Sequence, residues 1–124
     1  ARAIKLPGQY KSWAIHYRFP GYLRGKWHLY LETRCDKLEN YSETAMTCGI
    51  YDTESRRETL TVNVPYSKLQ SDSYKLLYMG EGNINEYSLF FVQASGGEDG
   101  RTAPDVWGQR LILSRKKVPS SIAR

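Results

Sequence analysis

The sequence predicts an all-β protein, an antiparallel up-and-down β-barrel of about eight strands. Three observations support this fold class. Apolar and polar residues alternate with a period of two over several segments, which is the pattern of strands that bury one face. Helical periodicity is nearly absent. The connections are short and contain no crossover helix, which favours sequential hairpins that close into a barrel.

The alternation is clearest in the segment 26–35, where Trp27, Leu29 and Leu31 share one face and polar residues occupy the other. Turn residues such as Gly, Pro, Asn and Asp separate the alternating segments. Pro65 is expected to stop the hydrogen-bond ladder of the strand before it. The strands expected from this pattern are 12–19, 26–35, a short strand at 46–50, 59–64, 74–79, 86–94 and 106–115.

Three connections carry specific expectations. The charged stretch 52–57 does not alternate and is expected to form a turn. Gly80-Glu81-Gly82-Asn83 lies between two β-rich runs, so we expect it to close a hairpin between 74–79 and 86–94. The segment 95–105 is rich in Gly and is expected to be a mobile loop.

Length and composition indicate one globular domain covering residues 1–124. Hydrophobic residues make up 40% and charged residues 25% of the chain, so a packed core is expected. No apolar run approaches the roughly 20 residues of a membrane-spanning helix. The start lacks both an initiator Met and a signal-peptide core, which suggests a processed or trimmed terminus.

The net charge is +5 at neutral pH, which favours anionic partners at long range. The densest basic groups are at 56–57 and 115–117, and the basic residues do not form one long block. A solvated basic surface and a dedicated site for a polyanion both fit this pattern.

Cys35 and Cys48 flank a polar stretch that contains the glycosylation sequon starting at Asn40. In a secreted protein the two cysteines would close the loop between two adjacent strands as a disulfide, with Asn40 on an exposed connection. Two free thiols in a cytosolic protein are the alternative. The cysteine spacing fits no usual zinc motif, so no metal site is expected.

The chain resembles the lipocalin family in three separated stretches. Gly8-Gln9-Tyr10 is similar to the first lipocalin box with Tyr in place of Trp, and Asn85-Glu86-Tyr87 is similar to a later box. Arg115 occupies the place of the arginine at the end of the last strand. The resemblance implies a secreted carrier whose barrel is closed at one end by Tyr10 and Arg115. A guanidinium over an aromatic ring, donating also to main-chain carbonyls, could make such a closure.

No catalytic constellation is evident. His16 and His28 lie on expected strands opposite apolar neighbours. Glu32 could share a face with His28, but no second catalytic partner is evident. No serine lies in a nucleophile elbow, and no Gly-rich loop matches a phosphate-binding motif. The sequence therefore predicts that the protein is not an enzyme and needs no cofactor.

The aromatic residues are the main candidates for binding. Ten Tyr, three Trp and three Phe are present, and tyrosine combines an apolar face with a hydroxyl that can fix an amphipathic molecule. Simple core packing is the alternative role for each ring. The expected ligand-binding residues are Tyr17, Trp27, Tyr30, Tyr78, Phe91 and Trp107.

Together these features predict a secreted, extracellular protein that carries or sequesters a small hydrophobic or amphipathic ligand inside a barrel. The alternative is a basic β-barrel module that binds a macromolecule. That partner would be a protein held through the 95–105 loop, or single-stranded nucleic acid. Basic and aromatic residues form no clear interleaved stripe, so binding to nucleic acid is expected to be weak at physiological salt.

Overall fold

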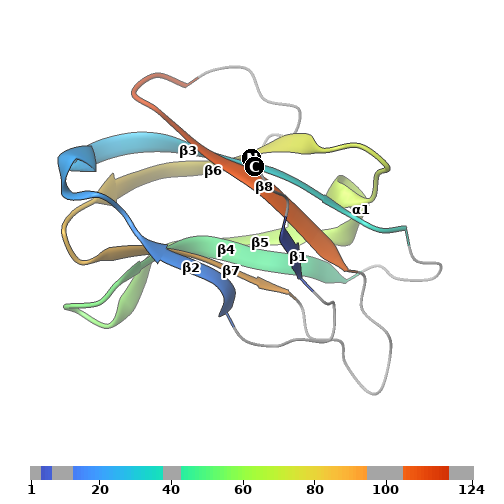
Figure 1. Ribbon diagram of the computed structural model, residues 1–124, viewed down its shortest axis with the longest axis horizontal. Helices are drawn as coiled ribbons and strands as arrows, with labels where there is room; N and C mark the ends of the chain where they lie inside the picture. Colours follow the sequence, from blue (N-terminus) through green and yellow to red (C-terminus); the bar gives the residue numbers. More distant parts are fainter. Residues whose placement is uncertain (1–3, 7–12, 38–42, 95–104, 118–124) are drawn as a thin grey trace.

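The computed structural model describes residues 4–6, 13–37, 43–94 and 105–117. Its strands form two four-stranded sheets, ordered β1-β8-β3-β6 and β2-β7-β4-β5, that face each other across an apolar core (Figure 1). All strand pairs are antiparallel. The elements are β1 (Ile4–Leu6), β2 (Trp13–Arg18), η1 (Gly21–Leu23), β3 (Gly25–Cys35), β4 (Thr44–Asp52), β5 (Arg57–Pro65), α1 (Tyr66–Leu69), β6 (Lys75–Ile84), β7 (Ser88–Ala94) and β8 (Val106–Ser114).

The strand pairing is nested. β1 pairs with β8, β2 with β7, β3 with β6, and β4 with β5. Two further pairs, β3 with β8 and β4 with β7, join these hairpin-like ladders into the two sheets. This arrangement, a long antiparallel ribbon wrapped into a two-layer sandwich, is a jelly roll.

The prediction of an antiparallel all-β fold is confirmed, but the up-and-down barrel is not found. Within the described strands, only β4 and β5 are neighbours both in sequence and in a sheet, and no closed barrel forms. Most connections instead cross from one sheet to the other (Figure 1). The sequence pattern could not reveal this, because alternation marks the buried face of a strand and not its neighbours.

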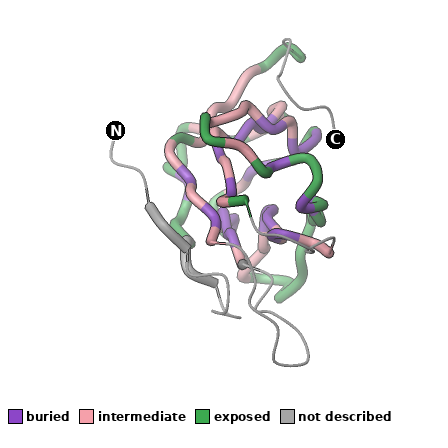
Figure 2. Tube along the Cα trace, turned by 90° about the vertical axis from the view of Figure 1, so that its right-hand side faces the viewer, coloured by how far each residue is buried: buried purple, intermediate pink, exposed green. Residues whose placement is uncertain are grey.

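The core lies between the inner faces of the two sheets. β5 shows the pattern most clearly, with Leu60, Val62 and Val64 buried and the residues between them exposed. Leu29 and Leu31 from β3 contribute to the same core, as the sequence predicts. In Figure 2, buried, intermediate and exposed residues follow one another along the trace. The burial of these apolar side chains is the main favourable term in folding.

The expected turn at 80–83 is wrong, because these residues continue strand β6. Gly80 lies at a pairing irregularity and has a φ of 125°. At Gly82 a Cβ atom would come within 2.6 Å of the Ile50 side chain on the opposite sheet. Both glycines therefore serve a strand, one at a bulge and one at a close approach of the two layers. The chain turns later, at Asn85 to Tyr87, and crosses to the other sheet.

The turn expected at 52–57 is confirmed as the connection between β4 and β5. The Asp52 carboxylate accepts hydrogen bonds from the backbone N–H groups of Ser55 (3.0 Å) and Glu54 (2.8 Å). These bonds lower the pKa of Asp52, that of Ser55 most strongly. Arg56 has a φ of 57°, which completes the reversal.

Among the described residues, no helix is long and apolar enough to cross a membrane.

Gly49 provides a test of how closely the strands pack. A Cβ at this position in β4 would lie 1.8 Å from the Leu60 carbonyl oxygen, which is backbone and cannot move aside. We expect Gly49→Ala to lower the free energy of unfolding by about 3 kcal/mol, the upper range for overpacking. Urea denaturation measures this change. Gly21→Ala is the control, because its Cβ would meet nothing within 4 Å, and equal losses in both variants would contradict the assignment.

Candidate functional site

A pocket opens on one side of the sandwich, between the two sheets. It has a volume of about 260 Å³. Tyr17 from β2 and Phe90 from β7 contribute from one sheet, and Leu31 from β3 contributes from the other. The remaining wall is the middle of β8, formed by Gly108, Gln109, Arg110 and Leu111.

The floor of the pocket is apolar and its rim carries polar groups. Leu31 and Phe90 are only 3% and 2% exposed, so both belong to the core as well as to the pocket. The Tyr17 ring packs on Phe90 at 5.6 Å between centroids and on Phe19 at 5.8 Å. Its partial burial raises the pKa of the Tyr17 hydroxyl to about 12, so this group stays a neutral hydrogen-bond donor and acceptor. The pocket therefore suits an apolar group with a polar end.

The charged residue of the rim is already neutralised. Arg110 donates two hydrogen bonds to Glu32, from Nε at 3.0 Å and from Nη2 at 2.8 Å. This bidentate bond lowers the pKa of Glu32 and raises that of Arg110. The rim therefore favours a neutral occupant over a carboxylate or phosphate.

The six aromatic residues predicted to bind a ligand do not all line this pocket. Of the six, only Tyr17 lines the pocket, and its neighbour there is Phe90 in place of the predicted Phe91. Phe91 is fully buried outside the main core cluster. Tyr30 is also fully buried, and its ring packs on Tyr78 at 5.1 Å.

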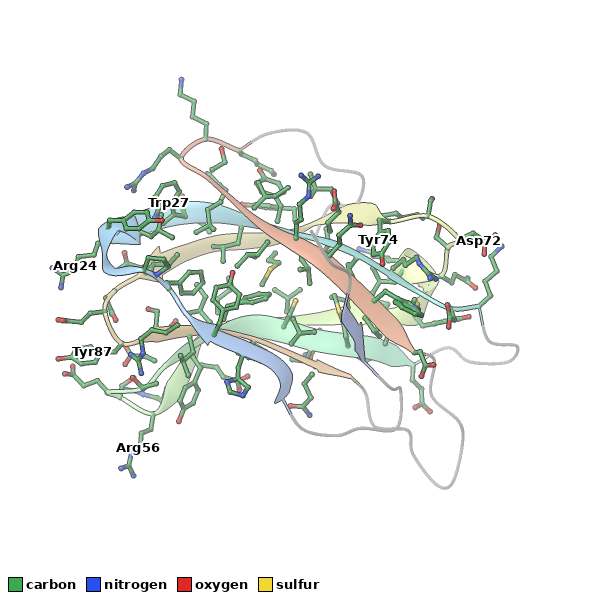
Figure 3. All side chains as sticks on the ribbon, in the orientation of Figure 1. Arg24, Trp27, Arg56, Asp72, Tyr74 and Tyr87 are labelled. Carbon is green, nitrogen blue, oxygen red and sulfur yellow. The ribbon has the colours of Figure 1, made fainter. Side chains whose placement is uncertain are left out.

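Trp107, another predicted ligand residue, serves to hold an arginine. Arg34 lies over the Trp107 ring at 4.8 Å and near the Tyr74 ring at 5.6 Å. Asp36 pairs with Arg34 at 2.8 Å and accepts a hydrogen bond from Trp107 Nε1 at 3.2 Å. This closed set of partners is typical of a structural cluster. Trp27 is the remaining predicted ligand residue. Figure 3 shows it well away from Tyr74, which belongs to the Arg34 cluster.

Arg115 and Trp27 form a lock at the end of the sandwich near η1. The guanidinium lies 3.7 Å from the Trp27 ring centroid and donates to the carbonyls of Lys26 (3.0 Å) and Arg24 (3.3 Å). Gly25 has a φ of 112°, and a Cβ there would lie 2.9 Å from Arg115 Nη1. Arg115 was predicted to close a barrel with Tyr10. In the structure it contacts Trp27 and two main-chain carbonyls at one end of a sandwich. Tyr10, the predicted partner, lies outside the described residues.

Several positively charged side chains lie close to the contact between Arg115 and Trp27. We call the exposed residues Arg24, Lys26, Arg115, Lys116 and Lys117 the basic corner. They lie around the start of β3 and directly after the end of β8, two strands that pair so that His28 lies opposite Ser114. Lys117 Nζ also lies 4.8 Å from the centroid of the Tyr78 ring. Figure 3 shows Arg24 and Trp27 together at this end.

The predicted disulfide is absent, because Cys35 and Cys48 are both free thiols. Cys35 lies in β3 and Cys48 in β4, which belong to different sheets, so the expectation of adjacent strands is wrong. Burial raises the pKa of each thiol to about 12. Asn40 and the greater part of the 95–105 loop lie outside the described residues.

The two histidines lie on different sheets, His28 on β3 and His16 on β2. His28 Nδ1 lies 2.8 Å from the Tyr78 hydroxyl, and its Nε2 lies 3.6 Å from a carboxylate oxygen of Glu81. His16 is exposed on β2. Within the described part of the chain, no three His, Cys, Asp or Glu residues are placed to hold a metal ion.

Comparisons of the chain with protein-family models, with curated proteins and with solved structures found no match. The resemblance to lipocalins therefore still depends on the short sequence stretches alone. Among the described residues, the pocket and the basic corner are the surfaces from which we argue a function.

The thiols provide a chemical test of the core. At pH 8 we expect a thiol reagent to modify neither cysteine at an appreciable rate in the folded protein, and both promptly in denaturant. Above the ordinary thiol pKa of 9.0 the unfolded state loses protons that the folded state keeps to about 12, so stability should fall as the pH rises. Fewer than two titratable thiols per unfolded, unreduced chain would restore the disulfide.

The lock can be tested with Arg115→Ala. Loss of the cation–π contact should lower the free energy of unfolding by about 1 kcal/mol. The Trp27 indole becomes more exposed, so we also expect a red shift of tryptophan emission. The shift should vanish in a Trp27→Phe background, and Arg56→Ala at the exposed turn should leave both readouts unchanged. A shift that persists without Trp27 would contradict the pairing.

Proposed function

We propose that this chain is a non-catalytic structural subunit that assembles with further copies of itself. The nested jelly-roll pairing is the observation that carries this proposal. Jelly rolls form the subunits of viral capsids and also occur as lectin and cupin domains. Because one fold serves several functions, the choice among them has to come from the surfaces of this chain.

The size of the pocket favours a side chain as its occupant. Sites for carried ligands commonly have volumes of about 300–1,000 Å³. The pocket here, at about 260 Å³, falls below that range and is open on one side. A cavity of about 150 Å³ is enough for a benzene ring. One aromatic side chain of a neighbouring molecule therefore fits the available volume.

The chain carries a matching group elsewhere on its surface. Tyr22 is 84% exposed, the most exposed large apolar residue among those described. It lies in η1, at the end of the sandwich, where Leu23 N–H donates to the Pro20 carbonyl at 3.0 Å and fixes the turn. Tyrosines that insert into pockets are among the strongest contributors to interface energy.

A contact between the η1 end of one copy and the side pocket of the next would be heterologous. Such contacts use two different surfaces on each molecule, so they propagate into closed rings or extended arrays. The neutral rim, with Arg110 paired to Glu32, suits the uncharged Tyr22 side chain. Assembly of this kind uses the pocket without requiring a ligand chamber in the core.

A second candidate is the binding of a small amphipathic ligand, as expected from the sequence. The apolar floor with the Tyr17 hydroxyl and the Gln109 amide at the rim supports it. The pocket would then take the place of the predicted barrel interior. Secretion of such a carrier has only the sequence features to support it.

Assembly is tested by sedimentation velocity over a range of protein concentrations. We expect oligomers that dissociate on dilution, and we expect Tyr22→Ala to weaken association about 30-fold, the effect of losing roughly 2 kcal/mol. Leu111→Trp should act similarly by filling the pocket, with its folding checked by urea denaturation. Tyr22→Phe is the matched control and should retain assembly. A wild-type chain that stays monomeric at high concentration would rule the proposal out.

The two candidates are separated by titration with an apolar fluorescent probe. If the pocket is a ligand site, the probe saturates at one per chain and Leu111→Trp abolishes binding, whereas Tyr22→Ala has no effect. If the pocket serves assembly, Tyr22→Ala increases probe binding because the pocket is vacated. The aromatic replacements at Tyr78 and Phe91, central to the sequence-based hypothesis, should have no direct effect in either case.

A further inference from the structure

We propose that the basic corner binds nucleic acid through its phosphate backbone, without reading its sequence. This inference goes beyond self-assembly and does not depend on it, because every residue that it uses belongs to one chain. It concerns the five residues Arg24, Lys26, Arg115, Lys116 and Lys117, and not the pocket.

The fold brings these charges together from distant parts of the chain. Pairing of β3 with β8 places the segment after Ser114 beside the start of β3. The two hydrogen bonds from Arg115 to the carbonyls of Arg24 and Lys26 then fix the two segments to each other. Sequence analysis could identify 115–117 as a basic group, but not its neighbours across the sheet.

The negative charge nearby is limited. Glu86 pairs with Arg24 at 3.3 Å, and Glu81 lies 3.6 Å from His28. Within the described residues, no carboxylate forms an ion pair with Lys26, Lys116 or Lys117. Each of the three lysines is exposed, so its ammonium group can reach a phosphate without first breaking a salt bridge.

Arg115 has a different role in the corner. Its guanidinium is committed to Trp27 and to two main-chain carbonyls, so it shapes the surface and adds to the local potential. The lysines supply mobile point charges, which neutralise phosphates by position and not by a fixed geometry. Such contacts give affinity with little sequence preference.

Single-stranded nucleic acid is favoured over an anionic membrane because the exposed large side chain beside the corner is that of Tyr22, an aromatic ring on which a base can stack. The Trp27 ring is covered by Arg115, and its Nε1 donates to the Leu23 carbonyl at 2.7 Å. Surface binding to lipid normally combines basic residues with exposed apolar side chains that enter the headgroup region. Among the described residues, the exposed large hydrophobic side chains are all tyrosines, and the five residues of the corner are all charged.

The test is fluorescence anisotropy with a labelled single-stranded 20-mer of mixed sequence at several salt concentrations. Neutralising about three phosphates should give a slope of log K against log salt near −2. Binding is then readily measured at low salt and largely lost at physiological salt. The double variant Lys26→Ala with Lys116→Ala should reduce the magnitude of the slope by about 1.4.

The control changes the same charge elsewhere. Arg56→Ala with Arg57→Ala removes two exposed cations from the turn between β4 and β5, and it should leave the slope nearly unchanged. Equal weakening by both double variants would assign the effect to net charge and overturn the site. So would the absence of binding at low salt, or tighter binding to vesicles of phosphatidylserine and phosphatidylcholine than to the oligonucleotide.

Self-assembly and nucleic-acid binding are distinguishable in the same experiment. Tyr22→Ala should disrupt assembly but keep the salt slope per chain, because Tyr22 is not among the cations. A slope lost in Tyr22→Ala would mean that the corner acts only in an assembled form, which contradicts the single-chain site.

Discussion

The close approach of the two sheets is the constraint on which the rest of this structure depends. A Cβ at Gly82 would come within 2.6 Å of the Ile50 side chain on the opposite sheet, and within one sheet Gly49 lies against the Leu60 backbone. With the layers this close, side chains such as Leu29, Met46 and Met79 fill the interior. The pocket formed by the described residues lies at one side of the sandwich, and Leu31 and Phe90 of this core form its floor.

The individual strands could be predicted from the sequence because burial of one face leaves a local, two-residue signature. Strand β5, with its alternation at Leu60, Val62 and Val64, is the clearest case. Which strands pair with each other leaves no comparable signature in the sequence. The sequence therefore predicts simple hairpins, whereas the structure has the nested pairing. Gly80 and Gly82 favour a hairpin turn at 80–83 in the sequence, because a glycine in a turn cannot be told there from a glycine at a bulge or at a tight contact between sheets.

The residues of the pocket, like the strands, could be predicted only where their signal is local in the sequence. Tyr17 was predicted to bind because it is aromatic and lies on an alternating strand, and it does line the pocket. Tyr30 has the same features but is fully buried against Tyr78, and Phe91 is fully buried outside the main core cluster. Alternation gives the face of a residue, whereas exposure depends on what packs over that face. The pocket itself needs β2, β3, β7 and β8 together, so no segment of the sequence carries its signal.

The contacts of the arginine and lysine side chains explain why the net charge alone does not locate a binding surface. Three arginines of the β1-β8-β3-β6 sheet and its C-terminal end are committed within the fold, each through the planar geometry of its guanidinium. Arg110 is held by Glu32, Arg34 by Asp36 and two aromatic rings, and Arg115 by Trp27 and main-chain carbonyls. These arginines stabilise contacts between strands. Carboxylates neutralise the charges of Arg34 and Arg110, whereas that of Arg115 adds to the local potential. Lysine, with its compact and strongly hydrated ammonium, is less suited to such stacking and stays at the surface. The charge available to a partner is therefore concentrated where lysines gather around a locked arginine, and the fold creates that place at the basic corner.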